Sequence, residues 1–188
     1  MVDPNQIRSP EVRRVYEYWL GKKQPDKLPS RADLAPKELK SLGSCTFLID
    51  VVRAPLHFRV RFFGTRLVHW AGCDLTGLVI YQPESSAPLQ PWRQLFQEYR
   101  SVVEARQPRY DEHSREWGKE HQRFERIIAP LSGDGEAVDM LFGALDLHAT
   151  PAFVLASRTP EVATDDERGT PQRAATKVAK WDMGKRRT

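Results

Sequence analysis

The sequence has no long apolar run and only two cysteines. No stretch approaches the roughly 18 consecutive apolar residues that a membrane-spanning helix needs. The first residues, MVDPNQIRSPEVRR, lack the apolar segment of a secretory signal. Cys45 and Cys73 lie far apart, in contexts that do not suggest a disulfide framework. We therefore expect a cytoplasmic protein.

Motifs of common enzymes and metal sites are also missing. The chain has no Gly-rich phosphate loop, no G-x-S-x-G and no H-E-x-x-H. His69 and Cys73 stand four residues apart on a predicted helix and could face one metal ion, but no second pair has ligand spacing. A buried cysteine and a histidine at the helix rim are the favoured interpretation. The sequence therefore predicts a protein that is not an enzyme and has no metal site.

Positive charge is concentrated at the C-terminal end of the chain. The net charge is +4, from 29 basic and 25 acidic residues. The segment from Ser157 onward contains 8 of the basic and 5 of the acidic residues, which leaves 21 and 20 in the rest. A balanced body lacks the single-signed face of a duplex-binding domain. Nucleic-acid binding is therefore not expected, except weakly through the basic tail, which could equally contact an acidic partner or a membrane surface.

Two helical patterns are clear. Residues 9–21 have Ser9 as a capping residue, Pro10 at the first helical position and Gly21 at the end. Residues 89–107 have the strongest apolar face in the chain and end before Pro108. The segment between 22 and 35 is predicted to be an extended linker, and a shorter helix is predicted at about 65–71.

Within the predicted strand 57–63, Phe58, Val60 and Phe62 alternate with His57, Arg59 and Arg61, which indicates one buried face and one face toward solvent. Further strands are predicted at about 45–52, 109–117, 120–131 and 137–148. Glu112, Glu116 and Glu125 alternate with apolar residues and are expected to face water. After residue 148 the pattern fades, and 157–188 is predicted to be disordered or loosely helical. The pattern predicts an α+β fold.

Six short segments, taken in order, resemble a bacterial, alphaproteobacterial family of single-domain PAS proteins, long catalogued as a domain of unknown function. They are YEYW (16–19), LPSRADLAP (28–36), FLIDV (47–51), FRVRFFGT (58–65), DLTG (74–77) and PLSGDGEAVDMLFGAL (130–145). The resemblance implies a PAS-like five-stranded antiparallel sheet with helices on one face, and a sensory or regulatory role. It divides the chain into a flanking helix and linker (1–35), the PAS-like domain (36–150) and a basic tail (151–188).

Two cofactor-binding types of PAS domain, those for flavin and haem, can be compared with this chain residue by residue. Flavin photoreceptors of this fold have a motif that resembles NCRFLQ around their cysteine, whereas Cys73 lies in GCDLTG. Haem-binding types need an axial histidine, usually on the long helix, and residues 89–107 contain none; a C-x-x-C-H attachment motif is absent too. Flavin and haem are therefore disfavoured, and the cofactor is unknown.

The apolar face of the long helix could line a pocket for a small apolar ligand, or it could be ordinary core. The candidate lining residues are Phe62, Arg66, Trp70, Phe96, Tyr99, Tyr110, His113 and Phe142. The first helix presents a similar choice, since its face could pack on its own sheet or form a homodimer interface. The residues of that face are Val12, Val15, Tyr16 and Trp19.

These observations favour a regulatory domain that contacts a protein partner and is gated by a small apolar ligand. The alternative is a small isomerase or hydrolase with a cavity on a similar curved sheet. That enzyme would need an acid with a raised pKa in an apolar pocket, and the candidates are Asp50, Asp111 and Asp146. A third possibility is an interaction module without any ligand.

Overall fold

The computed structural model describes residues 2–82, 90–117 and 120–148, and for residues 40, 90–92, 113–117, 120–123 and 147–148 it describes the backbone alone. The predicted tail, 151–188, and the predicted turn at 118–119 lie outside the described residues. The helices are η1 (Pro4–Gln6), α1 (Pro10–Lys22), η2 (Arg31–Asp33), α2 (Pro36–Ser41), α3 (Thr65–Ala71) and α4 (Gln90–Ala105). The strands are β1 (Thr46–Arg53), β2 (Leu56–Phe63), β3 (Val79–Tyr81), β4 (Arg109–Trp117), β5 (Glu120–Leu131) and β6 (Met140–His148).

The strands form one antiparallel sheet in the order β3-β2-β1-β6-β5-β4. The five predicted strands are present, and β3 is a sixth that the sequence pattern did not reveal. Only three residues long, β3 is too short to show alternation. The turn before it directs the chain to the edge of β2, because the Asp74 carboxylate accepts from the Thr76 N–H and the Gly77 N–H donates to the Val60 carbonyl.

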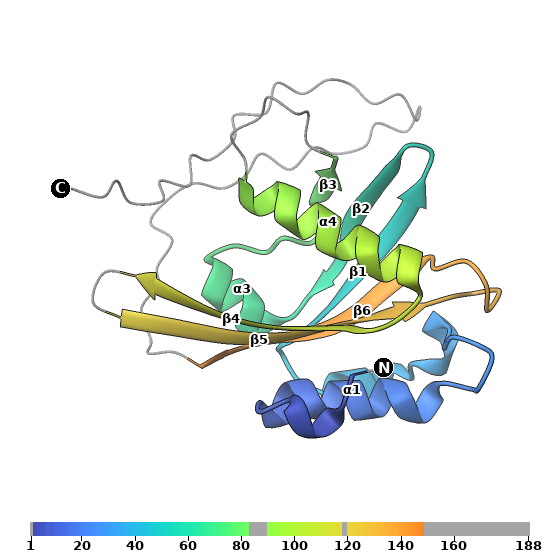
Figure 1. Cartoon of the computed structure of the whole chain (residues 1–188), viewed down its shortest axis with the longest axis horizontal. Helices are drawn as coiled ribbons and strands as arrows, with labels where there is room; N and C mark the ends of the chain where they lie inside the picture. Colours follow the sequence, from blue (N-terminus) through green and yellow to red (C-terminus); the bar gives the residue numbers. More distant parts are fainter. Residues whose placement is uncertain (1, 83–89, 118–119, 149–188) are drawn as a thin grey trace.

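Helices cover both faces of the sheet (Figure 1). We call the face that packs against α4 the inner face, and the face that packs against α1 the outer face. Phe58 of β2 contacts Phe96 and Tyr99 of α4, with both ring centroids 5.3 Å away. On the other side, the Trp19 indole donates to the Pro130 carbonyl over 2.9 Å. The prediction of helices on one face is therefore incomplete, because α1 is part of the packed fold.

The apolar face of α1 is buried within its own chain. Val12, Val15, Tyr16 and Trp19 are each at most 1% exposed. Helix α1 contacts β5 and β6, and the Tyr16 and Trp19 rings stack 6.1 Å apart. These four residues were predicted as a dimer interface, and that prediction is wrong: their side chains have no free surface because they complete the core on the outer face.

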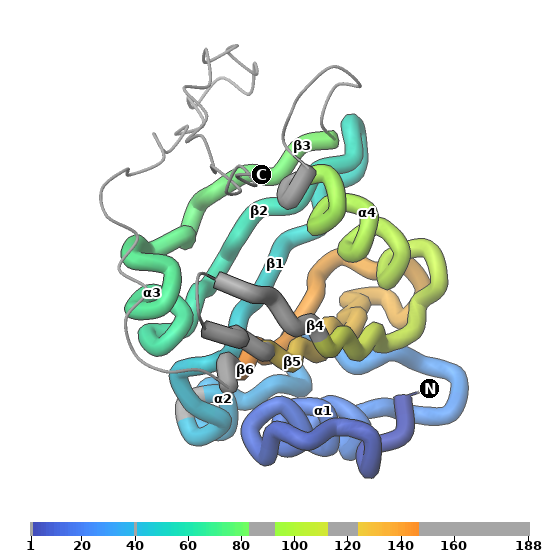
Figure 2. Tube along the Cα trace, turned by 60° about the vertical axis from the view of Figure 1, so that its left-hand side comes forward, coloured from blue at the N-terminus to red at the C-terminus, as the bar shows by residue number. Residues whose placement is uncertain are grey.

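Part of the outer face extends beyond α1. In Figure 2, β1 and β2 run away from α1 toward β3, while α1 lies along the β5–β6 side. The predicted alternation of β2 is confirmed up to Arg61, with Phe58 and Val60 buried, Arg59 half-buried and Arg61 exposed. It is wrong at Phe62, which was predicted on the buried face and is 45% exposed, because the register of β1 and β2 shifts there. Strand β1 is instead buried on both faces over Thr46–Ile49. No helix among the described residues is long and apolar enough to cross a membrane.

Candidate functional site

The start of α1 is attached to the outer face by two buried carboxylates. Glu125 of β5 accepts from the backbone N–H groups of Arg8 and Ser9, over 2.8 and 2.9 Å. The Ser9 hydroxyl donates to Asp146 of β6 over 2.7 Å and accepts from the Val12 N–H as the cap of the helix. Glu125 and Asp146 are paired directly opposite each other and are 0% and 5% exposed. Two negative charges therefore lie beneath the positive end of the helix dipole.

Two further side chains complete this group, which we call the α1 contact network (Ser9, Arg66, Tyr110, Glu125 and Asp146). The Tyr110 hydroxyl donates to Glu125 over 2.9 Å, and Arg66 of α3 binds Asp146. Arg66 also lies 3.6 Å from Glu11 of α1. The prediction that Glu125 faces water is wrong, because α1 covers its face of β5 and supplies backbone donors to the carboxylate. Glu112 is exposed as predicted, and the Glu116 side chain lies outside the described residues.

A second buried ionic group attaches α4 to the inner face. Arg126 of β5 donates through Nη2 to Glu98 of α4 over 2.5 Å and to Asp111 of β4 over 2.8 Å. Arg109 lies 2.8 Å from Asp111. We call these four residues the α4 contact network. Glu98, Asp111 and Arg126 are each at most 9% exposed, and Arg109 supplies the second positive charge that balances the two carboxylates.

The pKa values follow from this packing. Burial favours the neutral form of Asp111, but its bonds to Arg109 and Arg126 outweigh that effect and lower its pKa below the ordinary value of 3.8. Burial raises the pKa of Tyr99 to about 12, with Glu98 contributing in the same direction and Arg126 opposing it. Tyr99 therefore keeps its proton, and Asp111 keeps its charge, at neutral pH.

The two networks are joined by neighbouring residues on the same strands. Successive side chains of a strand point to opposite faces. On β5, Glu125 binds the start of α1 and the next residue, Arg126, binds α4. On β4, Tyr110 bonds to Glu125 and the next residue, Asp111, bonds to Arg126. Strands β4 and β5 therefore each contain residues of both networks.

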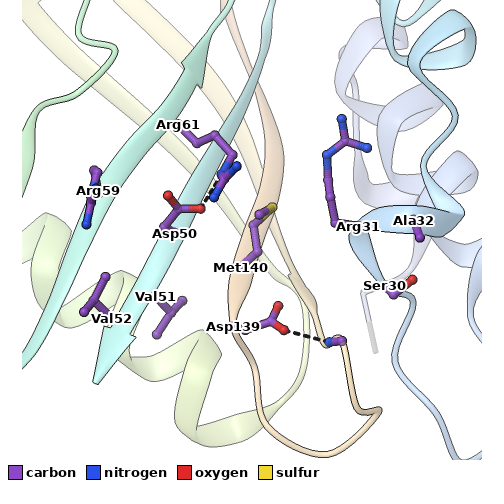
Figure 3. Close-up of a pocket in the computed structure, with 11 residues that line it drawn as sticks. Ser30, Arg31, Ala32, Asp50, Val51, Val52, Arg59, Arg61, Asp139 and Met140 are labelled. Atoms are coloured by element: carbon purple, nitrogen blue, oxygen red, sulfur yellow. Dashed lines mark hydrogen bonds and ion pairs between the residues drawn. The ribbon is translucent and has the colours of Figure 1, made fainter. Parts of the chain in front are cut away.

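An open groove of about 600 Å³ lies on the outer face, between η2 and the β1–β2 strands (Figure 3). Asp50 of β1 accepts from the Arg61 Nε over 2.6 Å, and Asp139 accepts from the Gly133 N–H over 2.8 Å. Figure 3 shows Arg31 on the opposite wall from Asp50 and Arg61. The lining residues are Ser30, Arg31, Ala32, Asp50, Val51, Val52, Arg59, Arg61, Gly133, Asp139 and Met140.

Comparison with known proteins gives the family. A family model described as PAS domain matches residues 7–146, which is most of the chain. The chain belongs to the PAS domain family. The match begins before α1, so it includes the helix that the sequence pattern treats as a flanking segment. Membership supports a sensory or regulatory domain, in a family that is generally not enzymatic.

Other comparisons add little to this assignment. No curated protein matches the chain. A solved structure described as "Flavin Analogue Sheds Light on Light-Oxygen-Voltage Domain Mechanism" superposes with a TM-score of 0.40 and 14% identity, covering 60% of this chain and 83% of that one. This likeness is too low to transfer a cofactor to the PAS domain described here.

The eight candidate pocket residues do not lie together in this PAS domain. Phe96 and Tyr99 lie on the inner face, in an aromatic cluster with Phe58. Phe142 lies on the outer face, where its ring meets Tyr18 edge-on at 6.4 Å. Tyr110 belongs to the α1 contact network on that same outer face. A single pocket lined by all of them is excluded, because alternate strand residues point to opposite sides of the sheet.

The other four candidates also lie apart. Arg66 binds Asp146, on the outer side of the sheet. Phe62 is paired with Leu48, beyond a register shift in β1–β2, and is 45% exposed. Trp70 is half-buried on α3, and the His113 side chain lies outside the described residues.

His69 and Cys73, the two residues considered as metal ligands, have no further ligands grouped with them among the described residues. No cluster of three or more histidine, cysteine, aspartate or glutamate side chains suited to a metal ion occurs in the described part of the chain. His69 is exposed and Cys73 half-buried. Cys45 is buried, and burial raises the pKa of its thiol, opposed by the charge of Arg66. Cys45 behaves as a small apolar side chain.

Sequence reasoning missed Ser9, Glu98, Glu125 and Arg126 as functional candidates. One signal was available in the segment FERIIAPL, where Glu125 and Arg126 are the only two charged residues in an otherwise apolar part of β5. Charged residues in a buried strand need partners on both faces. Which partners they would meet depends on α1 and α4, which are distant in the sequence.

Proposed function

We propose that this PAS domain is a cytoplasmic regulator that detects a small apolar ligand between α4 and the inner face and transmits the change through α1 to a protein partner. The observation that carries this proposal is that Glu125 and Arg126 are consecutive residues of β5. The first residue binds the start of α1 and the second binds α4. One strand thereby connects the helix over the candidate ligand side with the helix on the opposite face.

The mechanism is a shift between two states of the sheet and its helices. A ligand inserted beside Phe96 and Tyr99 displaces α4, and Glu98 moves with it. Because Glu98 and Asp111 share the Nη2 group of Arg126, this movement changes the position of β5. The carboxylate of Glu125 then moves relative to Ser9, which loosens α1. The partner recognises the altered outer side of the domain.

The proposal also covers compartment and assembly. Cys45 and Cys73 are both free thiols, which suits a reducing cytoplasm. We propose a homodimer, formed through a surface other than the buried face of α1. The enzyme alternative is not favoured by Asp111, because its pKa is lowered and an acid–base role in an apolar pocket would need a raised one.

Hydrogen exchange tests the connection between the two helices. We expect Glu98→Gln to speed the exchange of the Val12 and Arg13 amides at the start of α1 more than that of the β1 amides. A merely less stable protein would instead show equal acceleration throughout. Glu104→Gln is the matched control, since Glu104 lies on the same helix and forms only an exposed pair with Arg100.

An α1 exchange rate that is unchanged in Glu98→Gln, or that rises no more than the β1 rate, would contradict the proposed coupling. Native mass spectrometry of freshly purified protein, together with its absorbance spectrum, tests the ligand. A bound small molecule that is lost in Phe96→Trp would support the inner-face site, because the larger ring fills the space beside Phe58.

A further inference from the structure

The groove on the outer face has more positive than negative side chains. Its lining contains Arg31, Arg59 and Arg61 against Asp50 and Asp139. Both carboxylates already accept hydrogen bonds, Asp50 from Arg61 and Asp139 from the Gly133 N–H. The groove therefore attracts negative charge.

Two of the arginines have N–H groups without a hydrogen-bond partner among the described residues. Arg61 uses Nε for Asp50, its side chain is 57% exposed, and its Nη1 and Nη2 groups have no hydrogen-bond partner among the described residues. Arg31 uses Nη1 for the Leu34 carbonyl, and its Nη2 group likewise has no partner there. Arginine N–H pairs match carboxylate oxygens in geometry as well as in charge.

Exposed aromatic rings flank the arginines along the same face. Phe62 directly follows Arg61 and is 45% exposed, and Tyr81 is 47% exposed. The Tyr81 ring lies 5.1 Å from His57, which is two residues before Arg59 on β2. At roughly 3.3 Å per residue, His57 lies about 7 Å along β2 from Arg59 and about 13 Å from Arg61. Arginine and aromatic residues are enriched at protein interfaces and among the residues that contribute most to binding.

We propose that this groove binds an acidic segment of the partner protein, with carboxylates on Arg61 and Arg31 and apolar side chains on Phe62 and Tyr81. The inference rests on the proposed function, since it names the partner class of that regulatory domain. An extended segment fits the open shape of the groove better than an enclosed small molecule does. Its acidic side chains complement the arginines, and its apolar ones cover the exposed rings.

The test uses the full chain and a fluorescein-labelled peptide of about ten alternating Glu and Leu residues, long enough to cross the outer face of β2. We expect Arg61→Glu and Arg31→Glu each to weaken binding, measured by fluorescence anisotropy, by about tenfold. The same peptide with Gln in place of Glu should bind at least about tenfold more weakly to the unchanged protein. Arg61→Gln removes the arginine without placing a second negative charge beside Asp50. It therefore separates loss of the arginine contact with the peptide from repulsion caused by the new glutamate.

Arg100→Glu is the matched control, because Arg100 is an exposed arginine of α4. Equal binding by the groove variants and the unchanged protein would overturn the proposal, as would an equal loss in Arg100→Glu. Phosphate that displaces the peptide more than chloride of equal ionic strength would identify a small-anion site instead. Preferential displacement by duplex DNA would identify a nucleic-acid surface, and a changed molar mass in Arg61→Glu an interface between copies.

A negative result in the hydrogen-exchange experiment does not decide the peptide-binding experiment, and the reverse is also true. Glu98 lies on α4, which covers the inner face, and is absent from the groove, so an unchanged exchange rate in Glu98→Gln contradicts the coupling and leaves the groove result intact. Peptide binding that ignores Arg31 and Arg61 contradicts the acidic partner and leaves the coupling intact.

Discussion

Each of the buried charges on the two faces of β5 is compensated by a specific partner. Arg126 donates to two carboxylates, and Glu125 accepts two backbone N–H groups and a tyrosine hydroxyl. Removing one member leaves its buried partner with fewer hydrogen bonds, which costs more than the net contribution of the intact contact. At the residue scale, these side chains therefore fix the positions of α1 and α4 more than they add stability.

Asp111→Asn is predicted to lower the free energy of unfolding by about 1–3 kcal/mol at neutral pH, because it removes a charged partner of Arg126. The Asp111 pKa is lowered in the folded protein, so its contribution is complete above its ordinary value of 3.8 and is lost as the pH falls through the folded value. The difference between the two proteins should therefore be constant from about pH 5 to 8 and shrink below about pH 4.

Urea denaturation at a series of pH values measures this effect. Glu104→Gln, at an exposed pair, is the control and should differ little from the unchanged protein at any pH. A difference for Asp111→Asn that stays constant down to the acid limit of folding would show that Asp111 has no lowered pKa.

At the scale of the elements, the approach of β1, β5 and β6 depends on one glycine. A Cβ at Gly143 of β6 would overlap the Ile127 carbonyl oxygen and the Phe47 ring. Gly143 is paired with Phe47 of β1 on one side and with Ile128 of β5 on the other, so β6 cannot move away from either neighbouring strand. Gly21 near the end of α1 has no atom within 4 Å of such a Cβ. Glycine has a packing role at one site and none at the other.

We predict that Gly143→Ala lowers the free energy of unfolding by more than about 2 kcal/mol, since backbone and ring must both move. Gly21→Ala should raise it by about 0.5–1 kcal/mol, because alanine loses less conformational entropy in a helix. Thermal unfolding followed by circular dichroism compares the two. Similar effects of both substitutions would contradict the close approach of the three strands.

At the scale of the whole molecule, α1 belongs to the core of its own domain. Val15 is 1% exposed and lies on the face that packs on β5 and β6. The apolar face of the helix is therefore not available for assembly in the folded state. Any homodimer must use other surfaces.

We predict that Val15→Ala lowers the free energy of unfolding by about 1–3 kcal/mol and leaves the molar mass of the folded protein unchanged. Urea denaturation and light scattering on the same samples measure the two quantities. Arg61→Gln, on the exposed part of the outer face, serves as a control for stability. A folded monomer in place of a dimer, with unchanged stability, would show that the face of α1 is an interface after all.

The sequence by itself determined the local elements. Periodicity and capping residues predicted α1 from Ser9, α3 over 65–71 and the length of α4 to within two residues at each end, because these signals act between neighbours in the chain. The resemblance of six short segments also indicated a PAS domain, which the comparison confirmed over residues 7–146, whereas the bacterial origin stays a prediction.

Only the tertiary structure decided which face each side chain meets. Phe142 and Phe96 carry the same apolar signal, yet they lie on opposite sides of the sheet. The alternation pattern predicts that Glu125 faces solvent, but Glu125 is buried because α1 packs over it. A local pattern shows only whether each side chain is apolar or charged. Which groups surround that side chain depends on contacts between distant segments, such as Ser9 and Glu125, which are more than 100 residues apart.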